Sequence, residues 1–125
     1  MNKKLTYLLA LTFLFLFSGS SVVFGDDYQD GVDAYKRKDY KTAYKLWLPL
    51  AEQGNAKAQY NLGVMYAKGR GFPQDYILAH MWLNLSGANG YKRGIKLRNL
   101  AEKKMTASQI EKARELARNW KPTSK

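Results

Sequence analysis

The side chains that most often carry chemistry are scarce in this sequence of 125 residues. It contains one histidine, His80, and no cysteine. A protein metal site usually needs three or four ligands, so an isolated imidazole makes a poor one. We therefore expect no metal and no cofactor, and we interpret His80 as a packing or rim residue of a helix.

Other catalytic motifs are also missing. Ser86 is followed by a glycine, but the G-x-S-x-G pattern of a nucleophile elbow is absent. The segment Gly69-Arg70-Gly71 lacks the glycine-lysine pattern that cradles phosphates. A helix end and a turn explain those glycines fully. The residues thus predict a protein that is not an enzyme.

Two helical patterns joined by a glycine-rich loop occupy residues 55–90. Asn55 and Asp75 are N-cap residue types at their starts. Gly69 can supply a left-handed C-cap, and Pro73 prevents the first helix from continuing. Apolar or small residues recur at helical spacing: Ala58, Leu62, Met65 and Tyr66, then Ala79, Trp82, Leu83, Leu85 and Ser86. Small residues at 58, 63 and 79 predict a close crossing of the two helices.

The same pattern occurs earlier in the chain, which indicates a repeat. Residues 39–54 align without gaps on residues 75–90, at an offset of 36. We expect helices over 26–38, with Tyr28, Val32 and Tyr35 on one face, and over 39–53, kinked by Pro49. A decayed third hairpin follows over 91–120. Its first helix presents Leu97, Leu100, Ala101 and Met105 as an apolar face, and Thr106 with Gln109 forms a capping box for the last helix.

These patterns predict an all-α fold, a short solenoid of αα-hairpins with about six helices. The hairpins span about 26–53, 55–90 and 91–120. The central stretch resembles the Sel-one-like repeat family, relatives of the tetratricopeptide repeat. The matching residues are Ala58, Gln59, Tyr60, Leu62, Gly63, Met65, Tyr66, Gly69, Gly71, Asp75, Ala79 and Trp82. The resemblance implies a TPR-like superhelix that presents a surface for protein contacts.

The first 25 residues have the three-part plan of a secretory signal peptide. Two lysines precede the apolar run Leu5–Phe17, and small and polar residues follow it up to Gly25. The run is shorter than the roughly 20 residues that span a bilayer. We therefore expect cleavage after Gly25, a domain over 26–125 with no transmembrane span, and a periplasmic or secreted location. An uncleaved N-terminal anchor is the alternative.

Positive charge is concentrated near the C-terminus. Residues 91–125 hold 11 basic and 3 acidic side chains, whereas residues 26–90 hold 8 and 7. Lys92, Lys96 and Lys103 share a helical stripe that could meet an anionic envelope component, although a solvated face that keeps a small domain soluble is the favoured interpretation. We expect no nucleic acid as partner, because an export signal removes the chain from it.

The first hypothesis is an exported scaffold for protein–protein interaction, whose partner is an envelope protein. The candidate interaction surface is Lys57, Asn61, Val64, Lys68, Lys92, Lys96 and Lys103. One alternative is a hydrolase acting on envelope material, a role suggested for some relatives of the family it resembles. Others are a binder of anionic cell-wall or lipid surfaces through the basic C-terminal helices, and a cap that binds longer repeat relatives end to end.

Overall fold

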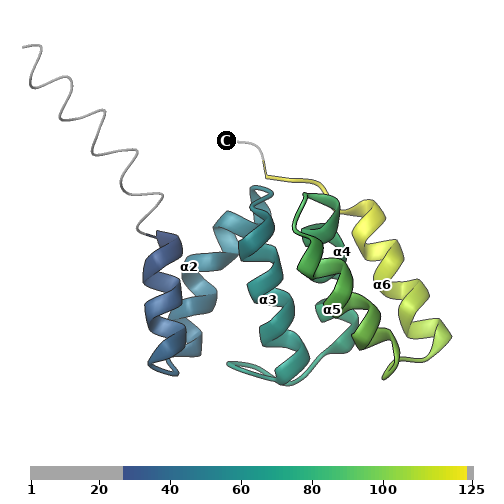
Figure 1. Cartoon of the computed structure of the whole chain (residues 1–125), viewed down its shortest axis with the longest axis horizontal. Helices are drawn as coiled ribbons and strands as arrows, with labels where there is room; N and C mark the ends of the chain where they lie inside the picture. The colour runs from purple at the N-terminus through teal and green to yellow at the C-terminus, as the bar shows by residue number, and fades with distance from the viewer. Residues whose placement is uncertain (1–26, 124–125) are drawn as a thin grey trace, which may run out of the picture.

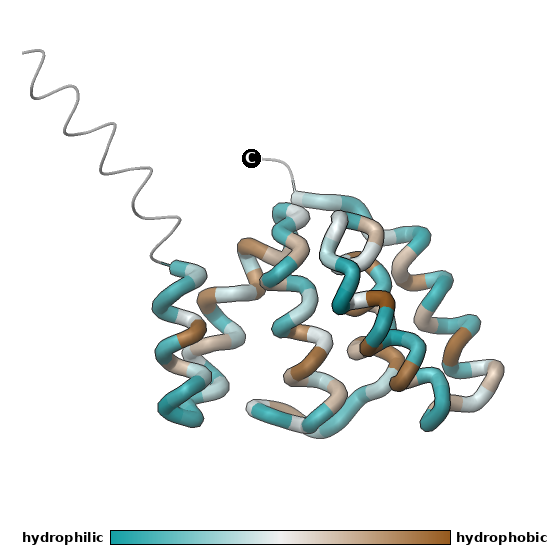
Figure 2. Tube along the Cα trace, viewed as in Figure 1, coloured by the Kyte–Doolittle hydropathy of each residue, from teal (hydrophilic) through white to brown (hydrophobic). Residues whose placement is uncertain are grey.

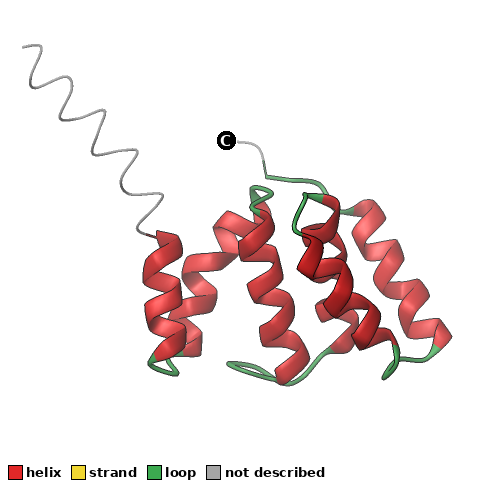
Figure 3. Ribbon diagram, in the orientation of Figure 1, coloured by secondary structure: helices red, strands yellow, loops and turns green. Residues whose placement is uncertain are grey.

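The computed structural model describes residues 27–123, and all regular secondary structure in this range is helical (Figure 3). A helix over 27–36 precedes α2 (Tyr40–Glu52), α3 (Ala56–Lys68), α4 (Tyr76–Ala88), α5 (Lys92–Glu102) and α6 (Ala107–Asn119). The predicted all-α fold class is confirmed. The predicted signal peptide, residues 1–25, lies outside the described residues. Between residues 27 and 123, no helix combines the length and the apolar character needed to cross a membrane.

The helices stack side by side as antiparallel pairs, from the helix over 27–36 at one end to α6 at the other (Figure 1). Within this stack α3 packs against α2 and α4, and α4 also contacts α5 and α6. The outer helices bury one face against their neighbours, whereas the central α4 is buried on most sides between α3, α5 and α6. The first helices of the three hairpins, 27–36, α3 and α5, therefore share one side of the stack.

The predicted helix boundaries follow from the capping residues. Asn55 Oδ1 accepts a hydrogen bond of 2.9 Å from the Ala58 amide, and Asp75 Oδ1 accepts one of 3.0 Å from Leu78. Gly69 ends α3 with a φ of 65°, in the left-handed region that glycine adopts without strain. The capping box of Thr106 and Gln109 is present at the start of α6.

The apolar core runs through the interior of the stack. Hydrophobic residues recur at intervals between hydrophilic ones along the helices that build it (Figure 2). It includes Trp47, Leu62, Met65 and Trp82, together with several small alanines at the crossings. A Cβ atom added at Gly63 would lie 2.6 Å from Cγ of the buried Leu83. The close crossing of α3 and α4 that the small residues predicted is therefore confirmed.

One predicted face is wrong in part. Ala101 is buried, as expected, but the side chain of Leu100, placed by the sequence analysis on the same apolar face, is 54% exposed. Helix α5 turns Gly94 and Ala101, seven residues apart, toward α4. Because successive helical residues are separated by about 100°, Leu100 then points away from that contact.

The end of the chain folds back along the stack. The Trp120 ring meets the Trp82 ring edge-on, with centroids 6.4 Å apart. The Thr123 amide then donates a hydrogen bond of 2.8 Å to the Glu52 carbonyl at the end of α2. The last described residues therefore tie α6 to the first repeat, and they satisfy a helix-end carbonyl that lacks an intrahelical partner.

Candidate interaction groove

A groove of about 560 Å³ lies on the side of the stack formed by the first helices of the hairpins. Most of its walls come from the helix over 27–36 and from α3, with a single contribution from α5. Its lining residues are Tyr28, Val32, Tyr35, Lys36, Trp47, Tyr60, Asn61, Val64, Ala67, Lys68 and Leu97. Aromatic and aliphatic side chains with a few polar groups are typical of a binding surface. We name this surface the inner groove.

Close packing between the first two helices shapes the floor of the inner groove. A Cβ atom at Gly31 would lie 2.3 Å from Nε1 of Trp47, so only glycine lets the two helices approach this closely. The indole Nε1 donates a hydrogen bond of 3.1 Å to the Tyr28 carbonyl. Trp47 therefore fixes the helix over 27–36 at a distance that leaves the aromatic side chains of that helix facing α3.

Polar contacts and aromatic packing fix the walls. Asn61 Nδ2 donates a hydrogen bond of 3.2 Å to the Tyr28 hydroxyl across the groove. Tyr60 packs edge-on against Tyr91, the residue that precedes α5, with ring centroids 5.1 Å apart. The first contact joins the two repeats, and the second sets the start of α5 beside α3.

The charged side chains that line the inner groove are all basic. Lys36 and Lys68 line the groove and are exposed. Among the described residues that line it, none is acidic. Charge complementarity selects partners and speeds association more than it adds affinity. The groove is therefore suited to a segment that carries acidic residues between apolar ones.

The structure brings together three of the seven predicted surface residues. Asn61, Val64 and Lys68 line the inner groove. The other four side chains, Lys57, Lys92, Lys96 and Lys103, are exposed but lie outside its lining. The α5 lysines therefore do not continue the groove, and their part in binding stays a prediction.

The repeat offset of 36 explains which residues the sequence reasoning missed. Subtracting 36 from Val64 and Lys68 gives Tyr28 and Val32, and adding it to Asn61 gives Leu97. All three of these partners line the groove. The repeat offset does not separate the lysines of residues 92–103 from the groove, since Lys96 and Lys103 are equivalent to the lining residues Tyr60 and Ala67. They lie outside it because the groove is built mainly between the helix over 27–36 and α3, and α5 contributes only Leu97 to its lining.

The sequence matches one protein-family model over two adjacent segments. Two copies of one model, the Sel1 repeat, match residues 25–55 and 56–91. The chain belongs to the Sel1 repeat family. The predicted resemblance to Sel-one-like repeats is confirmed. Searches of curated proteins and of solved structures gave no significant match.

The two Sel1 repeats correspond to the two hairpins that build most of the inner groove. Repeats of this family generally mediate protein–protein interaction, and proteins made of them are typically scaffolds without enzymatic activity. Helices α5 and α6 lie beyond the matched residues, as the decayed third repeat predicted. This last hairpin of the Sel1 chain covers the apolar side of α4.

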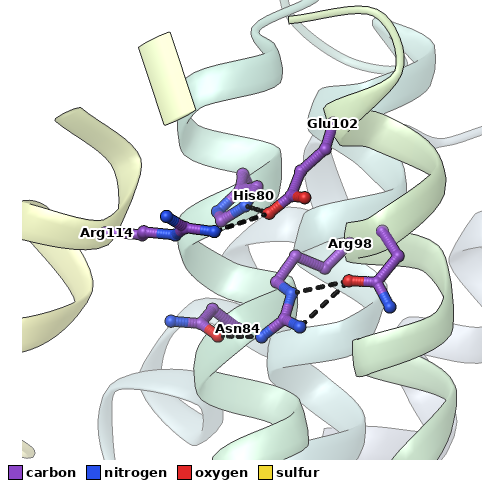
Figure 4. Close-up of polar contacts among 6 residues, drawn as sticks. His80, Asn84, Arg98, Glu102 and Arg114 are labelled. Carbon is purple, nitrogen blue, oxygen red and sulfur yellow. Dashed lines mark hydrogen bonds and ion pairs between the residues drawn. The ribbon is translucent and has the colours of Figure 1, made fainter. Parts of the chain in front are cut away.

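The last hairpin is joined to the second Sel1 repeat through His80 (Figure 4). The fully buried His80 contacts Glu102 of α5, with 2.8 Å between Nε2 and Oε1, and Arg114 of α6 approaches the same oxygen at 3.5 Å. The hydrogen bond from His80, aided by the positive charge of Arg114, lowers the pKa of Glu102 below the usual 4.5. The cluster therefore links three helices.

His80 is a packing residue, as expected, but its partner was missed because Glu102 stands 22 residues later. Its Nδ1 has no hydrogen-bond partner, so the tautomer that carries the proton on Nε2 suits the site best. Beside it, Arg98 donates a hydrogen bond of 2.6 Å to Asn84. Among residues 27–123, no group of three or more histidine, cysteine or acidic side chains could hold a metal ion.

Arg70 is a second residue whose role was missed. The turn prediction for Gly69-Arg70-Gly71 is confirmed, since both glycines have positive φ. Between them, the Arg70 guanidinium lies 5.4 Å from the ring centroid of Tyr35 and 5.8 Å from that of Tyr40. It also donates a hydrogen bond to the Tyr35 hydroxyl. This cation–π contact fastens the loop of the second repeat to the first hairpin.

Proposed function

We propose that this protein is an exported scaffold that binds a partner protein of the bacterial envelope in its inner groove. The main support for this proposal is the groove itself. Its walls are aromatic, two lysines line it, and both Sel1 repeats contribute residues to it. An extended segment with apolar and acidic residues matches its shape and charge. Membership of a family that mediates protein contacts supports the same function.

Site-specific photo-cross-linking in intact cells tests this proposal. A benzoylphenylalanine at Val64, which lines the groove, should give a discrete adduct with one envelope protein. The same group at Lys112, an exposed position of α6 outside the groove, should not. Equal adducts from both positions would show that the captured protein does not bind the groove.

Charge reversal in the groove supplies the control for the chemistry of the partner. In the Val64 cross-linking protein, Lys36→Glu with Lys68→Glu should remove most of the adduct, because both ammonium groups flank the groove. Lys112→Glu with Lys121→Glu changes the net charge equally at exposed sites elsewhere and should leave the adduct unchanged. An adduct insensitive to both pairs would contradict an acidic segment.

Export is tested separately by the mass of the protein recovered from the envelope or the medium. The sequence supports cleavage after Gly25, which leaves a mature chain that starts at Asp26. A mass that corresponds to all 125 residues in the membrane fraction would instead favour the uncleaved anchor.

A second candidate function rests on the exposed face of α5 and the residue that caps it. Lys92 and Lys96 are exposed on this helix and Lys103 is exposed at its C-cap, and Leu100 is a large exposed apolar side chain of the same helix. Together they support contact with an anionic surface. The chain should co-sediment with phosphatidylglycerol vesicles but not with phosphatidylcholine vesicles, and less so at high salt. Reversal of all three lysine charges without loss of sedimentation would exclude this face.

A further inference from the structure

A second cavity, of about 600 Å³, opens at the loop end of the stack and shares no lining residue with the inner groove. One wall is α2, and the other is the loop that connects α3 to α4. The lining residues are Lys41, Tyr44, Lys45, Tyr66, Gly71, Phe72, Pro73, Gln74 and Asp75. Its volume lies in the usual range for small-ligand sites, about 300–1,000 Å³.

Three aromatic side chains form the apolar part of this cavity. The Phe72 ring meets Tyr44 and Tyr66 edge-on, at centroid distances of 5.1 Å and 4.1 Å. The hydroxyl groups of Tyr44 and Tyr66 are 3.4 Å apart, so one of them can donate to the other. The second hydroxyl then keeps a proton that can be donated to a ligand.

The loop wall is held in place before any ligand arrives. The Asp75 amide donates a hydrogen bond of 2.9 Å to the Tyr66 carbonyl, and Gln74 Nε2 donates one of 2.6 Å to the Ala67 carbonyl. Gly71 has a φ of 93°, and a Cβ atom there would lie 3.0 Å from Tyr40 Cβ. With Arg70 fastened to the first hairpin, the cavity is preformed, which lowers the cost of binding.

The charges at the rim favour an anion. Lys41 and Lys45 are exposed, one turn apart on α2, and Tyr44 lies between them. The only acidic lining residue is Asp75, whose Oδ1 already accepts the Leu78 amide as the N-cap of α4. The cavity therefore offers two ammonium groups, one hydroxyl donor and an aromatic wall.

We propose that this cavity binds a carboxylate attached to an aromatic group, with the ring against Phe72 and the carboxylate between Lys41 and Lys45. Such a group occurs both in free aryl amino acids and at the C-terminus of a peptide that ends in phenylalanine. Burial, together with the hydrogen bond that Tyr66 shares with Tyr44, raises the pKa of Tyr66, so this pair of hydroxyl groups stays protonated at neutral pH and one of its protons is free to be donated.

Titration of the ¹⁵N-labelled protein followed by NMR tests the proposal. The probe is N-acetyl-L-phenylalanine, and its amide is the matched uncharged control. The acid should shift the backbone amides of residues 41–45 and 71–75 in a saturable way. The amide should bind about fivefold more weakly, because it lacks the charge that meets the lysines. Equal binding of acid and amide, or no shift in these segments, would overturn the proposal.

Variants locate the charge contact. Lys41→Glu with Lys45→Glu, both at exposed positions, should weaken binding of the acid about tenfold. Lys112→Glu with Lys121→Glu, at exposed positions outside the cavity, has the same charge change and should alter it less than about twofold. A short peptide ending in phenylalanine distinguishes the sources: tighter binding than the acid identifies a peptide terminus, and weaker binding identifies a free acid. Unchanged binding in Lys41→Glu with Lys45→Glu would overturn the proposal.

Discussion

Replacement of Gly94 by alanine should destabilise the fold, although alanine is the better helix former. Gly94 lies in α5 where this helix crosses α4. A Cβ atom there would be 2.7 Å from the Leu83 carbonyl oxygen and 2.9 Å from the Gly87 amide nitrogen. Both contacts are backbone atoms, which cannot rotate away as a side-chain end can. The two helices must therefore separate to admit one methyl group.

The magnitude follows from two opposed terms. Alanine in place of glycine gains at most about 1 kcal/mol of helix stability. Overpacking typically costs about 1–3 kcal/mol, and a clash with backbone belongs at the upper end. The free energy of unfolding should therefore fall by about 2 kcal/mol. For a domain of this size, that lowers the melting temperature by roughly 8–16 °C.

Urea unfolding followed by circular dichroism measures this change. Arg93→Ala, at the exposed neighbouring position of α5, is the matched control and should stay within about 0.5 kcal/mol of the wild type. A Gly94→Ala variant as stable as the wild type, or more stable, would refute the close crossing of α4 and α5. A separated α5 would also move Leu97 away from the inner groove, so cross-linking at Val64 should decrease.

Three further predictions concern stability. Ala79→Leu should overpack the fully buried crossing of α3 and α4 and cost about 1–3 kcal/mol by urea unfolding; an unchanged midpoint would contradict the burial of Ala79. Thr106→Ala should lose about 1 kcal/mol because it removes the capping box of α6, whereas Thr106→Ser should retain most of it. The lowered pKa of Glu102 means that its contribution to stability is present above pH 4.5 and is lost as the pH falls through the folded-state pKa. The stability difference between the wild type and Glu102→Gln, measured in urea at pH 7 and pH 3, should therefore shrink at the lower pH; a constant difference would argue against the contact with His80.

The fold was predictable because its signals are local. N-cap residues such as Asn55 and Asp75 satisfy amides two or three positions away, and glycine at 69 ends a helix through its own backbone conformation. The offset of 36 between the hairpins is likewise a property of the chain alone. None of these features requires knowledge of which helix lies beside which.

The candidate site was predictable only on α3. Asn61, Val64 and Lys68 follow from the repeat register, and the same register, applied one repeat in each direction, leads to Tyr28 and Leu97. The lysines at 92, 96 and 103 were chosen by charge and helical spacing, and the repeat register alone does not exclude them, because 96 and 103 are equivalent to the lining positions 60 and 67. Only the packing of the helices shows that the groove lies mainly between the helix over 27–36 and α3, so that α5 reaches it with Leu97 alone.

By itself, the sequence determined the helices, their caps, the repeat and the family. Only the tertiary structure decided how α5 is rotated, which partner His80 has, and where Arg70 and the final residues attach. Those contacts join residues far apart in the chain. Their geometry depends on how closely the helices approach at Gly31 and Gly94, which no local pattern of hydrophobicity or charge records.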